Sequence, residues 1–305
     1  MSRSETAIPK NAGTPPAPDG GDVFKIESLT MAYGDYVVMR DLDFSVKRGE
    51  IFFIIGGSGC GKSTLLRHMI GLAKPAAGRI LYRGEDFSGA TEERRLEILR
   101  EFGILYQGGA LWSSMTLSEN IALPLTEFSG ISEKEAAEIA DLKLALVGLN
   151  GFGGFYPSEI SGGMAKRAGL ARAIALDPLV LFFDEPSAGL DPVSSHRLDR
   201  LILQMRDSLG ATVVVVSHEL ASIFAIADRV VFLDANSKTQ GAIGSPRELL
   251  ERGPKDVRVF LNTLSRSIDL MKQGGIDAGI QREETDDSLI LTISIPKARQ
   301  PSQNG

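Results

Sequence analysis

The sequence predicts an α/β fold whose core is a mostly parallel β-sheet covered by helices. The apolar runs EIFFIIGG (50–57), LVLFFDEP (179–186) and ATVVVVSHE (211–219) have the length and composition of strands buried on both faces. Each run is followed by a helical segment, and such alternation is typical of parallel sheets. The length of 305 residues suits one large domain with appendages.

Composition and charge narrow the classes of function. The net charge of -6 argues against a general nucleic-acid binder, which more often carries a basic stripe. The single cysteine, Cys60, cannot form an internal disulfide, which favours a reducing compartment. No apolar run reaches the ~18 residues needed to span a bilayer, and the N-terminus lacks the apolar core of a signal peptide. We therefore expect a cytoplasmic protein that reaches a membrane only through partners.

The flanking segments suggest how the chain is divided. Residues 1–22 are rich in Pro, Gly and Ala, which predicts a disordered tail. Residues 23–33 and 36–50 alternate apolar and polar side chains around a Gly-Asp turn, which predicts an antiparallel β subdomain. The polar segment of about 84–160 is helical in places, so we interpret it as a helical subdomain inserted between two sheet elements.

The end of the chain has two predicted parts. RVVFLDANSKTQGAIG (229–244) has the pattern of a closing hairpin, so the main domain is expected to cover 23–250. Residues 251–305 form a C-terminal extension with one helical pattern and one alternating segment that predicts a strand. We hypothesise that this extension packs across a dimer, and we expect its last few residues to be disordered.

A strand, a loop and a helix together carry a complete phosphate-loop pattern. GGSGCGKS (56–63) matches G-x-x-x-x-G-K-[ST] and precedes a helix expected over 62–72. Glycines let backbone N–H groups turn around phosphate oxygens, and the helix dipole adds to the attraction. Lys62 can reach the β- and γ-phosphates, and the Ser63 hydroxyl can ligate Mg²⁺. The expected phosphate-binding residues are Gly56, Gly57, Ser58, Gly59, Cys60, Gly61, Lys62, Ser63 and Thr64, with Cys60 interpreted as a space-filling residue.

Two carboxylates end the apolar strand LVLFFDEP. Ligands bind at the carboxyl ends of strands in open α/β sheets, so Asp184 and Glu185 are placed where a nucleotide would lie. Asp184 is suited to hold Mg²⁺ through water, and Glu185 to orient and polarise the attacking water. The alternative is that both carboxylates only cap the loop before Pro186.

Three further residues are candidates at the same edge. His218 ends ATVVVVSHE, and we interpret it as a γ-phosphate contact, although lone histidines at strand ends are usually structural. Gln107 follows the apolar segment FGIL and could ligate Mg²⁺ or water, or be a plain loop amide. Tyr33 could stack on adenine or be an ordinary half-exposed strand tyrosine.

Together these residues resemble the ATP-binding subunit of an ABC transporter over about 23–250. ISGGMAKR (160–167) occupies the position of that family's signature motif, and SAGLD (187–191) matches its loop beside the catalytic glutamate. The resemblance implies a P-loop NTPase with an N-terminal antiparallel β subdomain and an inserted helical subdomain. It also implies ATP and Mg²⁺ as cofactors, with Lys62, Gln107, Glu185 and His218 as catalytic residues and Ser63, Gln107 and Asp184 as metal ligands.

The resemblance also implies a head-to-tail homodimer with two ATP sites. Ser161, Gly162 and Gly163 would open a helix whose positive end binds the ATP held by the other subunit, and Asp191 would line the interface. The sequence departs from the family at Ile160, usually leucine, and at Met164, usually glutamine. Methionine cannot hydrogen bond as glutamine does, so no polar role is expected for Met164. All catalytic positions remain, so active hydrolysis is expected.

Less discriminating residues point to a narrower group. Met164, YQGGALWSSMTLSENIALPL (106–125) and DVRVFLN (256–262) look most like the ATPases of Mla- and Mce-type lipid importers. That resemblance implies two integral-membrane permease subunits, a lipid-binding Mce-type protein as a further partner, no nucleic acid, and a place on the cytoplasmic face of the inner or plasma membrane. The alternatives are an ABC transporter of amino acids, metals or drugs, and a soluble ABC ATPase acting on ribosomes or DNA.

Force has to pass from the ATPase to a permease through a surface groove. We expect Ala110, Leu111 and Trp112, just after Gln107, to line this groove, because a partner helix needs apolar anchors. Trp112 could equally be a core residue.

Overall fold

The computed structural model describes residues 21–262, 279–285 and 288–294, and it confirms the predicted α/β fold. The predicted disordered tail lies outside the described residues except at its last positions, as does the C-terminal end from residue 295. The strands of the central sheet, in spatial order, are β10 (Thr239–Gly244), β9 (Arg229–Asp234), β3 (Ile51–Gly56), β8 (Thr212–Val216), β7 (Val180–Asp184) and β6 (Phe102–Leu105).

The central sheet is parallel except at one edge. Parallel pairs join β3 to β8 and β9, β8 to β7, and β7 to β6, whereas β10 pairs with β9 in the antiparallel sense. The β9–β10 pair is the predicted closing hairpin. Since parallel strands end at a common edge, the loops after β3, β7 and β8 meet there.

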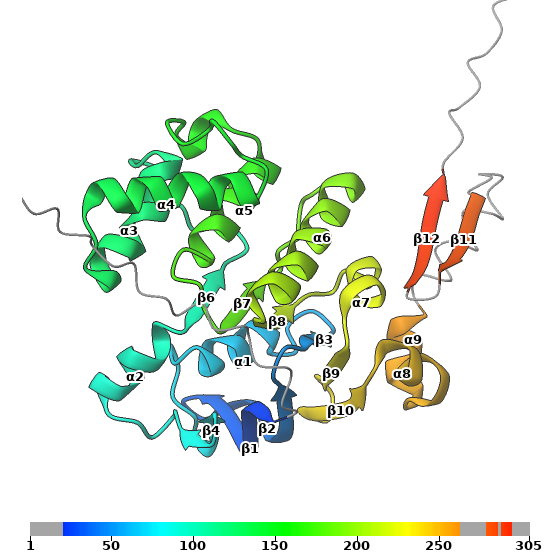
Figure 1. Cartoon of the computed structure of the whole chain (residues 1–305). Helices are drawn as coiled ribbons and strands as arrows, with labels where there is room; N and C mark the ends of the chain where they lie inside the picture. The colour runs from blue at the N-terminus through cyan, green and yellow to red at the C-terminus, as the bar shows by residue number, and fades with distance from the viewer. Residues whose placement is uncertain (1–20, 263–278, 286–287, 295–305) are drawn as a thin grey trace, which may run out of the picture.

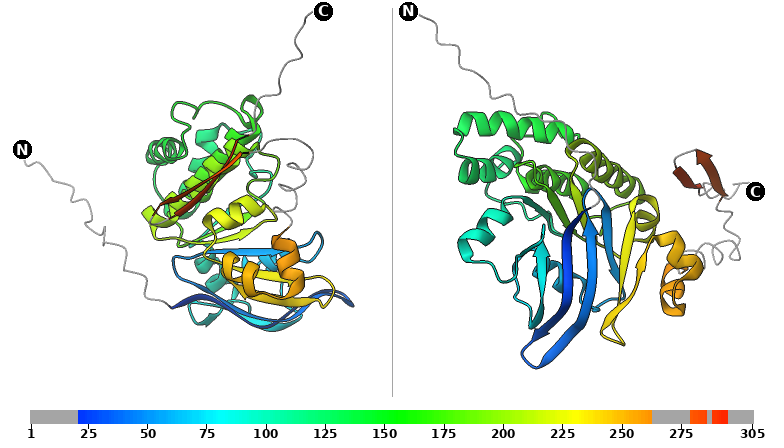
Figure 2. Two further views of the ribbon diagram at one scale, coloured as in Figure 1. Left: turned by 90° about the vertical axis from the view of Figure 1, so that its right-hand side faces the viewer. Right: turned by 60° about the horizontal axis from the view of Figure 1, so that its bottom comes forward.

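A second, antiparallel sheet flanks the central one. Its strands, in spatial order, are β2 (Tyr36–Lys47), β1 (Asp22–Tyr33), β4 (Ala77–Tyr82) and β5 (Glu85–Asp86). Strands β1 and β2 bury alternate residues, which is the half-buried pattern that the sequence predicts. In Figure 1 this sheet lies at the bottom of the molecule, and Figure 2 shows it from two further sides, opposite the helices α3 to α5.

Helices cover the sheets and build a separate helical part. Their bounds are α1 (Lys62–Met69), α2 (Glu92–Leu99), α3 (Leu117–Ser129), α4 (Glu133–Leu146), α5 (Gly162–Ala173), α6 (Pro192–Leu209), α7 (Leu220–Ile226), α8 (Pro246–Arg252) and α9 (Lys255–Leu261). Helix α3 packs against α4, and both pack against α5 (Figure 1). Helix α5, which begins with Gly162 and Gly163, therefore packs as part of the helical subdomain.

The segment 84–160 is not entirely helical. It contains β6, a strand of the central sheet that pairs with β7 from Phe102↔Val180 to Leu105↔Phe183. Phe102 and Leu105 are buried, so this short apolar run belongs to the core. A run of four strand residues between polar helices is too short to stand out by periodicity.

The central strands are buried on both faces because two hydrophobic clusters sandwich the sheet. Along β3, Ile51, Phe53 and Ile55 face the cluster shared with α3 to α6, whereas Phe52 and Ile54 face the cluster shared with α1 and the antiparallel sheet. This alternation explains why the sequence of β3 is continuously apolar.

The C-terminal extension begins as part of the main body. In α8 and α9, Leu249, Val257 and Leu261 are buried in the core cluster, and the Phe260 ring lies 5.4 Å from that of Phe232 on β9. The predicted strand near the end is β12 (Ser288–Ser294), which pairs with β11 (Gly279–Thr285) as an antiparallel hairpin. Packing of the extension across a dimer stays a prediction.

A buried carboxyl joins α6 to α7 behind the ligand edge. Asp199 on α6 is 6% exposed, and its Oδ2 accepts a hydrogen bond from Ser222 Oγ on α7 at 3.0 Å. Burial raises the pKa of Asp199 to about 6, the Ser222 hydrogen bond opposes that rise, and the charge of Glu219 adds to it. Folding therefore favours the protonated carboxyl relative to the unfolded chain, and above about pH 6 the folded chain must bury the charged form.

Asp199→Asn is expected to stabilise the protein at pH 7.5. Because the folded pKa lies above the ordinary value of 3.8, the stabilising contribution is complete below about pH 4 and is lost as the pH rises through about 6. Removing the charge should raise the free energy of unfolding by about 1–3 kcal/mol at pH 7.5 and change it little at pH 4. Urea unfolding at both pH values measures this, and a variant less stable than the wild type at pH 7.5 would contradict it.

Candidate functional site

The phosphate loop connects β3 to α1 in a conformation that requires glycine. Gly56 has φ of 151°, and a Cβ there would lie 2.5 Å from the Leu233 carbonyl oxygen. Gly61 has φ of 95°, and a Cβ there would lie 2.8 Å from Val38 Cγ1. Both positions combine an unfavourable φ with close packing, so these glycines are needed for the loop to form.

The first turn of α1 is open to an anion. Helices α2 to α6 each receive a side-chain N-cap, but the cap residue of α1, Gly61, has no side chain to offer. The free backbone N–H groups in the first turn of α1, together with the positive end of the helix dipole, are suited to bind phosphate. Lys62 Nζ donates to the carbonyl oxygens of Gly56 and Gly57 at 3.0 Å each, so the ammonium group lies over the loop.

Ser63 and Asp184 meet across the ligand edge. The Ser63 hydroxyl donates to Asp184 Oδ1 at 3.0 Å, which joins the start of α1 to the end of β7. Burial raises the pKa of Asp184, and the Ser63 hydrogen bond partly offsets this. Both groups offer oxygen, the ligand atom that Mg²⁺ prefers. Within residues 21–262, no group of three His, Cys, Asp or Glu residues could hold a metal ion.

Glu185 and His218 form a pair at the ends of neighbouring strands. His218 Nδ1 lies 2.8 Å from Glu185 Oε1, and because a carboxylate oxygen accepts, Nδ1 donates. The Glu185 backbone has φ of 49° and donates its N–H to the Val216 carbonyl at 2.8 Å. A glutamate in the left-handed region is uncommon, and such strain concentrates at functional sites. The pair can orient a water molecule and accept its proton, and Nε2 of His218 is left available for a phosphate oxygen.

Gln107 and Tyr33 lie at the same end of the molecule without direct contact to this pair. Gln107 is exposed and follows β6, next to β7 in the sheet. Tyr33 is 54% exposed and ends β1, two residues beyond Met31, whose side chain lies beside Gly61. Their roles toward metal and adenine stay predictions.

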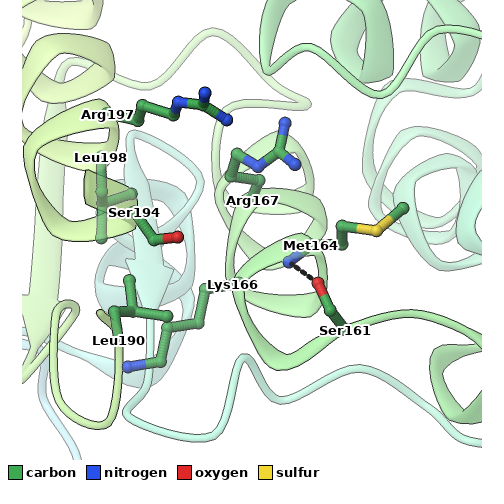
Figure 3. A pocket seen from close by; sticks show the side chains of 9 residues that line it. Ser161, Met164, Lys166, Arg167, Leu190, Ser194, Arg197 and Leu198 are labelled. Atoms are coloured by element: carbon green, nitrogen blue, oxygen red, sulfur yellow. Dashed lines mark hydrogen bonds between the residues drawn. The ribbon is translucent and has the colours of Figure 1, made fainter. Parts of the chain in front are cut away.

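Gly162 and Gly163 form the start of α5, as the sequence predicts. Ser161 caps this helix, and its Oγ accepts a hydrogen bond from the Met164 N–H at 3.3 Å (Figure 3). The Met164 side chain packs against the core cluster, in agreement with the absence of a polar role. Ser161 and Gly162 are exposed, so the helix N-terminus is accessible from outside the chain.

A cavity of about 240 Å³ lies between α5 and α6 beside this N-terminus. Its lining residues are Ser161, Gly163, Met164, Lys166, Arg167, Leu190, Ser194, Arg197 and Leu198 (Figure 3). Asp191 caps α6, accepting from the N–H groups of Val193 and Ser194 at 3.0 Å each. Hydrogen bonds from Ser194 lower the pKa of Asp191. None of the cavity-lining residues belongs to the phosphate loop of the same chain.

Two features of the site were not predicted from the sequence. Lys166, in the second turn of α5, is buried and donates to the carbonyl oxygens of Pro186 and Ala188, in the turn that follows Glu185. The only sequence signal was a lysine inside the string ISGGMAKR. The second feature is the left-handed backbone of Glu185, which no residue pattern announces because glutamate rarely adopts it.

A phosphate loop after β3, a carboxylate pair after β7 at the same edge of the sheet, and a helix that opens with capped glycines define a P-loop ATPase. The family model described as ABC transporter matches residues 39–188. The chain belongs to the ABC transporter ATP-binding family, whose members bind and hydrolyse ATP. A second family model, described as nucleoid occlusion protein C-terminal domain, matches residues 253–294.

Several known proteins are similar over most of the chain. The intermembrane phospholipid transport system ATP-binding protein MlaF of Haemophilus influenzae is 39% identical over 238 residues, 78% of this chain and 89% of the relative. The probable ribonucleotide transport ATP-binding protein mkl of Mycobacterium tuberculosis is 39% identical over 243 residues, 79% of this chain and 67% of the relative. The dimeric post-hydrolysis structure of the ATP-binding cassette MJ0796 bound to ADP and Pi is similar with a TM-score of 0.66 and 26% identity. The match covers 73% of this chain and 98% of the MJ0796 chain.

In the described part of the chain, no helix is both long and apolar enough to cross a membrane.

Glu185→Gln is expected to abolish hydrolysis without loss of ATP binding. The amide keeps the size and the His218 contact but cannot accept a proton, so turnover should fall by about a hundredfold or more. Nucleotide affinity should stay within about twofold, since the phosphate loop is untouched. Phosphate release and equilibrium binding of a fluorescent nucleotide measure the two effects.

The control is Glu219→Gln. Glu219 is an exposed carboxylate next to His218 in the chain, and its variant should hydrolyse ATP at the normal rate. Unaltered hydrolysis in Glu185→Gln would contradict the catalytic assignment.

Proposed function

We propose that the chain is the ATPase subunit of a lipid transporter and that two copies enclose two ATP–Mg²⁺ molecules. The observation that supports the dimer is the outward-facing Ser161 N-terminus of α5, whose adjoining cavity has no residue of its own phosphate loop. An anion site at Ser161 that is separate from the phosphate loop of its own chain is suited to bind the nucleotide held by a second copy. The MJ0796 cassette, similar in fold, is itself described as dimeric.

Each residue of the proposed ATP site has its own role. Lys62 and the N–H groups of Gly57 to Thr64 hold the phosphates, Ser161 to Gly163 of the other copy close the γ-phosphate, and Tyr33 stacks on adenine. Ser63, Gln107 and Asp184 would hold Mg²⁺, which would neutralise phosphate charge when bound. Glu185 accepts the proton of the attacking water, and His218 contacts the γ-phosphate. Asp191 lines the contact between the copies.

An exposed aromatic surface is suited to the permease. Trp112 is 57% exposed, which excludes the alternative that it is a core residue. The Leu117 N–H donates to the Phe155 carbonyl at 2.8 Å, which brings the loop of Phe155 and Tyr156 beside the loop of Trp112. Phe155 and Tyr156 are 41% and 42% exposed. Exposed aromatic side chains grouped in this way are typical of a protein contact.

The loop that carries Trp112 is held rigidly. Asn120 is fully buried, accepts from the Trp112 N–H at 2.7 Å, and donates to the carbonyls of Trp112, Met115 and Thr116. Arg172 donates to the Ala110 carbonyl. A preorganised aromatic anchor loses little entropy on binding, so this surface can receive an apolar helix of a permease and transmit force to it.

Lipid is the proposed cargo because the phospholipid transport ATPase MlaF is similar over most of the chain. The partners would then be two integral-membrane permease subunits and a lipid-binding Mce-type protein, with the ATPase on the cytoplasmic face of the inner or plasma membrane. A relative of equal identity is named for ribonucleotide transport, so a transporter of another cargo is the second candidate. No nucleic acid is expected as a partner, in line with the net charge of -6.

Trp112→Ala is expected to uncouple the chain from its permease. Truncating a central aromatic anchor should weaken retention of an integral-membrane partner by about tenfold or more, and phospholipid transport should fall with it. ATP binding should not change, because Trp112 does not contact the phosphate loop. Co-purification from membranes and transfer of labelled phospholipid between vesicles measure the two losses.

The matched control is Leu179→Ala, which removes a side chain of similar exposure, 46%, at the opposite end of the sheet. It should retain the partner. If the wild-type chain retains no integral-membrane partner, or if ribosomes or DNA co-purify instead, the transporter proposal is wrong. Transfer of another cargo but not phospholipid would favour the second candidate.

A further inference from the structure

Lys166 is a buried lysine that has no carboxylate within ion-pair distance among residues 21–262. Its side chain is on α5, is 9% exposed, and donates from Nζ to the Pro186 carbonyl at 2.8 Å and to the Ala188 carbonyl. Burial lowers its pKa, while the charge of Glu185 opposes that shift. Burying an ammonium group is costly, and an apolar residue of similar size would fill this space without that penalty. The retained charge therefore points to a role for these two hydrogen bonds.

The two carbonyl groups belong to the turn that follows Glu185. This turn is closed by hydrogen bonds from the Ala188 N–H to the Glu185 carbonyl at 3.2 Å and from the Leu190 N–H to the Ser187 carbonyl at 3.0 Å. Ser187 is 4% exposed, so the turn is packed on the inside as well. A backbone held in the left-handed region, as at Glu185, persists only where its surroundings fix it. Lys166 supplies two of those fixing contacts.

Neighbouring cations on α5 hold different parts of the chain. Arg167 donates to the carbonyls of Val147 and Gly148 at 2.9 and 3.0 Å, and so ties α5 to the end of α4. Lys166 extends from α5 toward the loop of Leu190 (Figure 3). Arg167 therefore anchors α5 to the helical subdomain, and Lys166 anchors it to the turn that follows Glu185.

We propose that Lys166 is a positioning residue that couples the Ser161 end of α5 to Glu185 of the same chain. This inference rests on the proposed dimer, in which Ser161 to Gly163 contact the partner's ATP while Glu185 acts on the chain's own ATP. Helix α5 moves as a rigid rod, so when its N-terminus engages the partner's γ-phosphate, Lys166 carries that displacement to Pro186 and Ala188. Glu185 then reaches its hydrolytic position only when both sites are filled.

The test uses the full chain and compares Lys166→Met with Lys166→Arg. Methionine fills the space but donates no hydrogen bond, so kcat should fall by about tenfold or more, as is typical when a supporting contact is lost. The Hill coefficient for ATP should fall from about 2 toward 1, since the sites no longer communicate. Binding of ATP to the separate protomer should stay within about twofold. Arginine can still donate to both carbonyls, so Lys166→Arg should recover most of the cooperativity.

The control is Lys143→Met, which removes another buried lysine, 7% exposed and paired with Asp177 far from the Glu185 turn. It should keep kcat and the Hill coefficient, whatever its effect on thermal stability. If Lys166→Met does not fold, Lys166→Leu carries the same expectations, because its apolar side chain also donates no hydrogen bond to either carbonyl. Wild-type kcat and cooperativity in a folded Lys166 variant would overturn the proposal, as would equal losses in Lys143→Met.

Failure of this proposal can be told apart from failure of the proposed function. A wild-type chain that hydrolyses ATP without cooperativity would contradict the dimer and, with it, the coupling. A cooperative wild type with an equally cooperative Lys166→Met would contradict the coupling alone.

Discussion

The geometry of the site depends on one constraint: parallel strands end at a common edge, and backbone N–H groups there can surround only part of a phosphate group. Strands β3, β7 and β8 bring the phosphate loop, Asp184 with Glu185, and His218 to that edge. The cavity beside Ser161, between α5 and α6, is lined by no residue of the phosphate loop of the same chain. In the proposed dimer, the exposed Ser161 end of α5 contacts the phosphate from the other side, which gives a physical reason for its place on an outer face.

Much of the fold could be predicted because its pattern is local. The apolar runs of β3, β7 and β8 and the glycines of the phosphate loop are dictated by burial and by backbone conformation, both of which leave their mark on composition. Strand β6 was missed because four residues within polar helices give too little periodicity. The exposure of Trp112 was also open, since a tryptophan suits a core and a contact surface equally well.

The contacts that the sequence could not give are those between residues distant in the chain. Nothing in the string ISGGMAKR shows that Lys166 donates to carbonyls some 20 residues later, because a lysine there could as well face solvent. The same holds for Asn120, whose amide fixes the Trp112 loop, and for the carboxyl of Asp199 buried against α7. Each is a polar group satisfied by tertiary structure, and such groups fix the positions of functional side chains without contributing to any motif.

The central claim is that neither protomer completes a nucleotide site alone. The most direct measurement is the ATPase rate per protomer as the protein is diluted at saturating ATP and Mg²⁺. The rate per protomer should fall steeply once the concentration drops below that at which dimers form, because the nucleotide of a lone chain is not contacted by the Ser161 end of a partner's α5. A rate per protomer that stays constant down to concentrations at which light scattering shows only monomers would contradict this account.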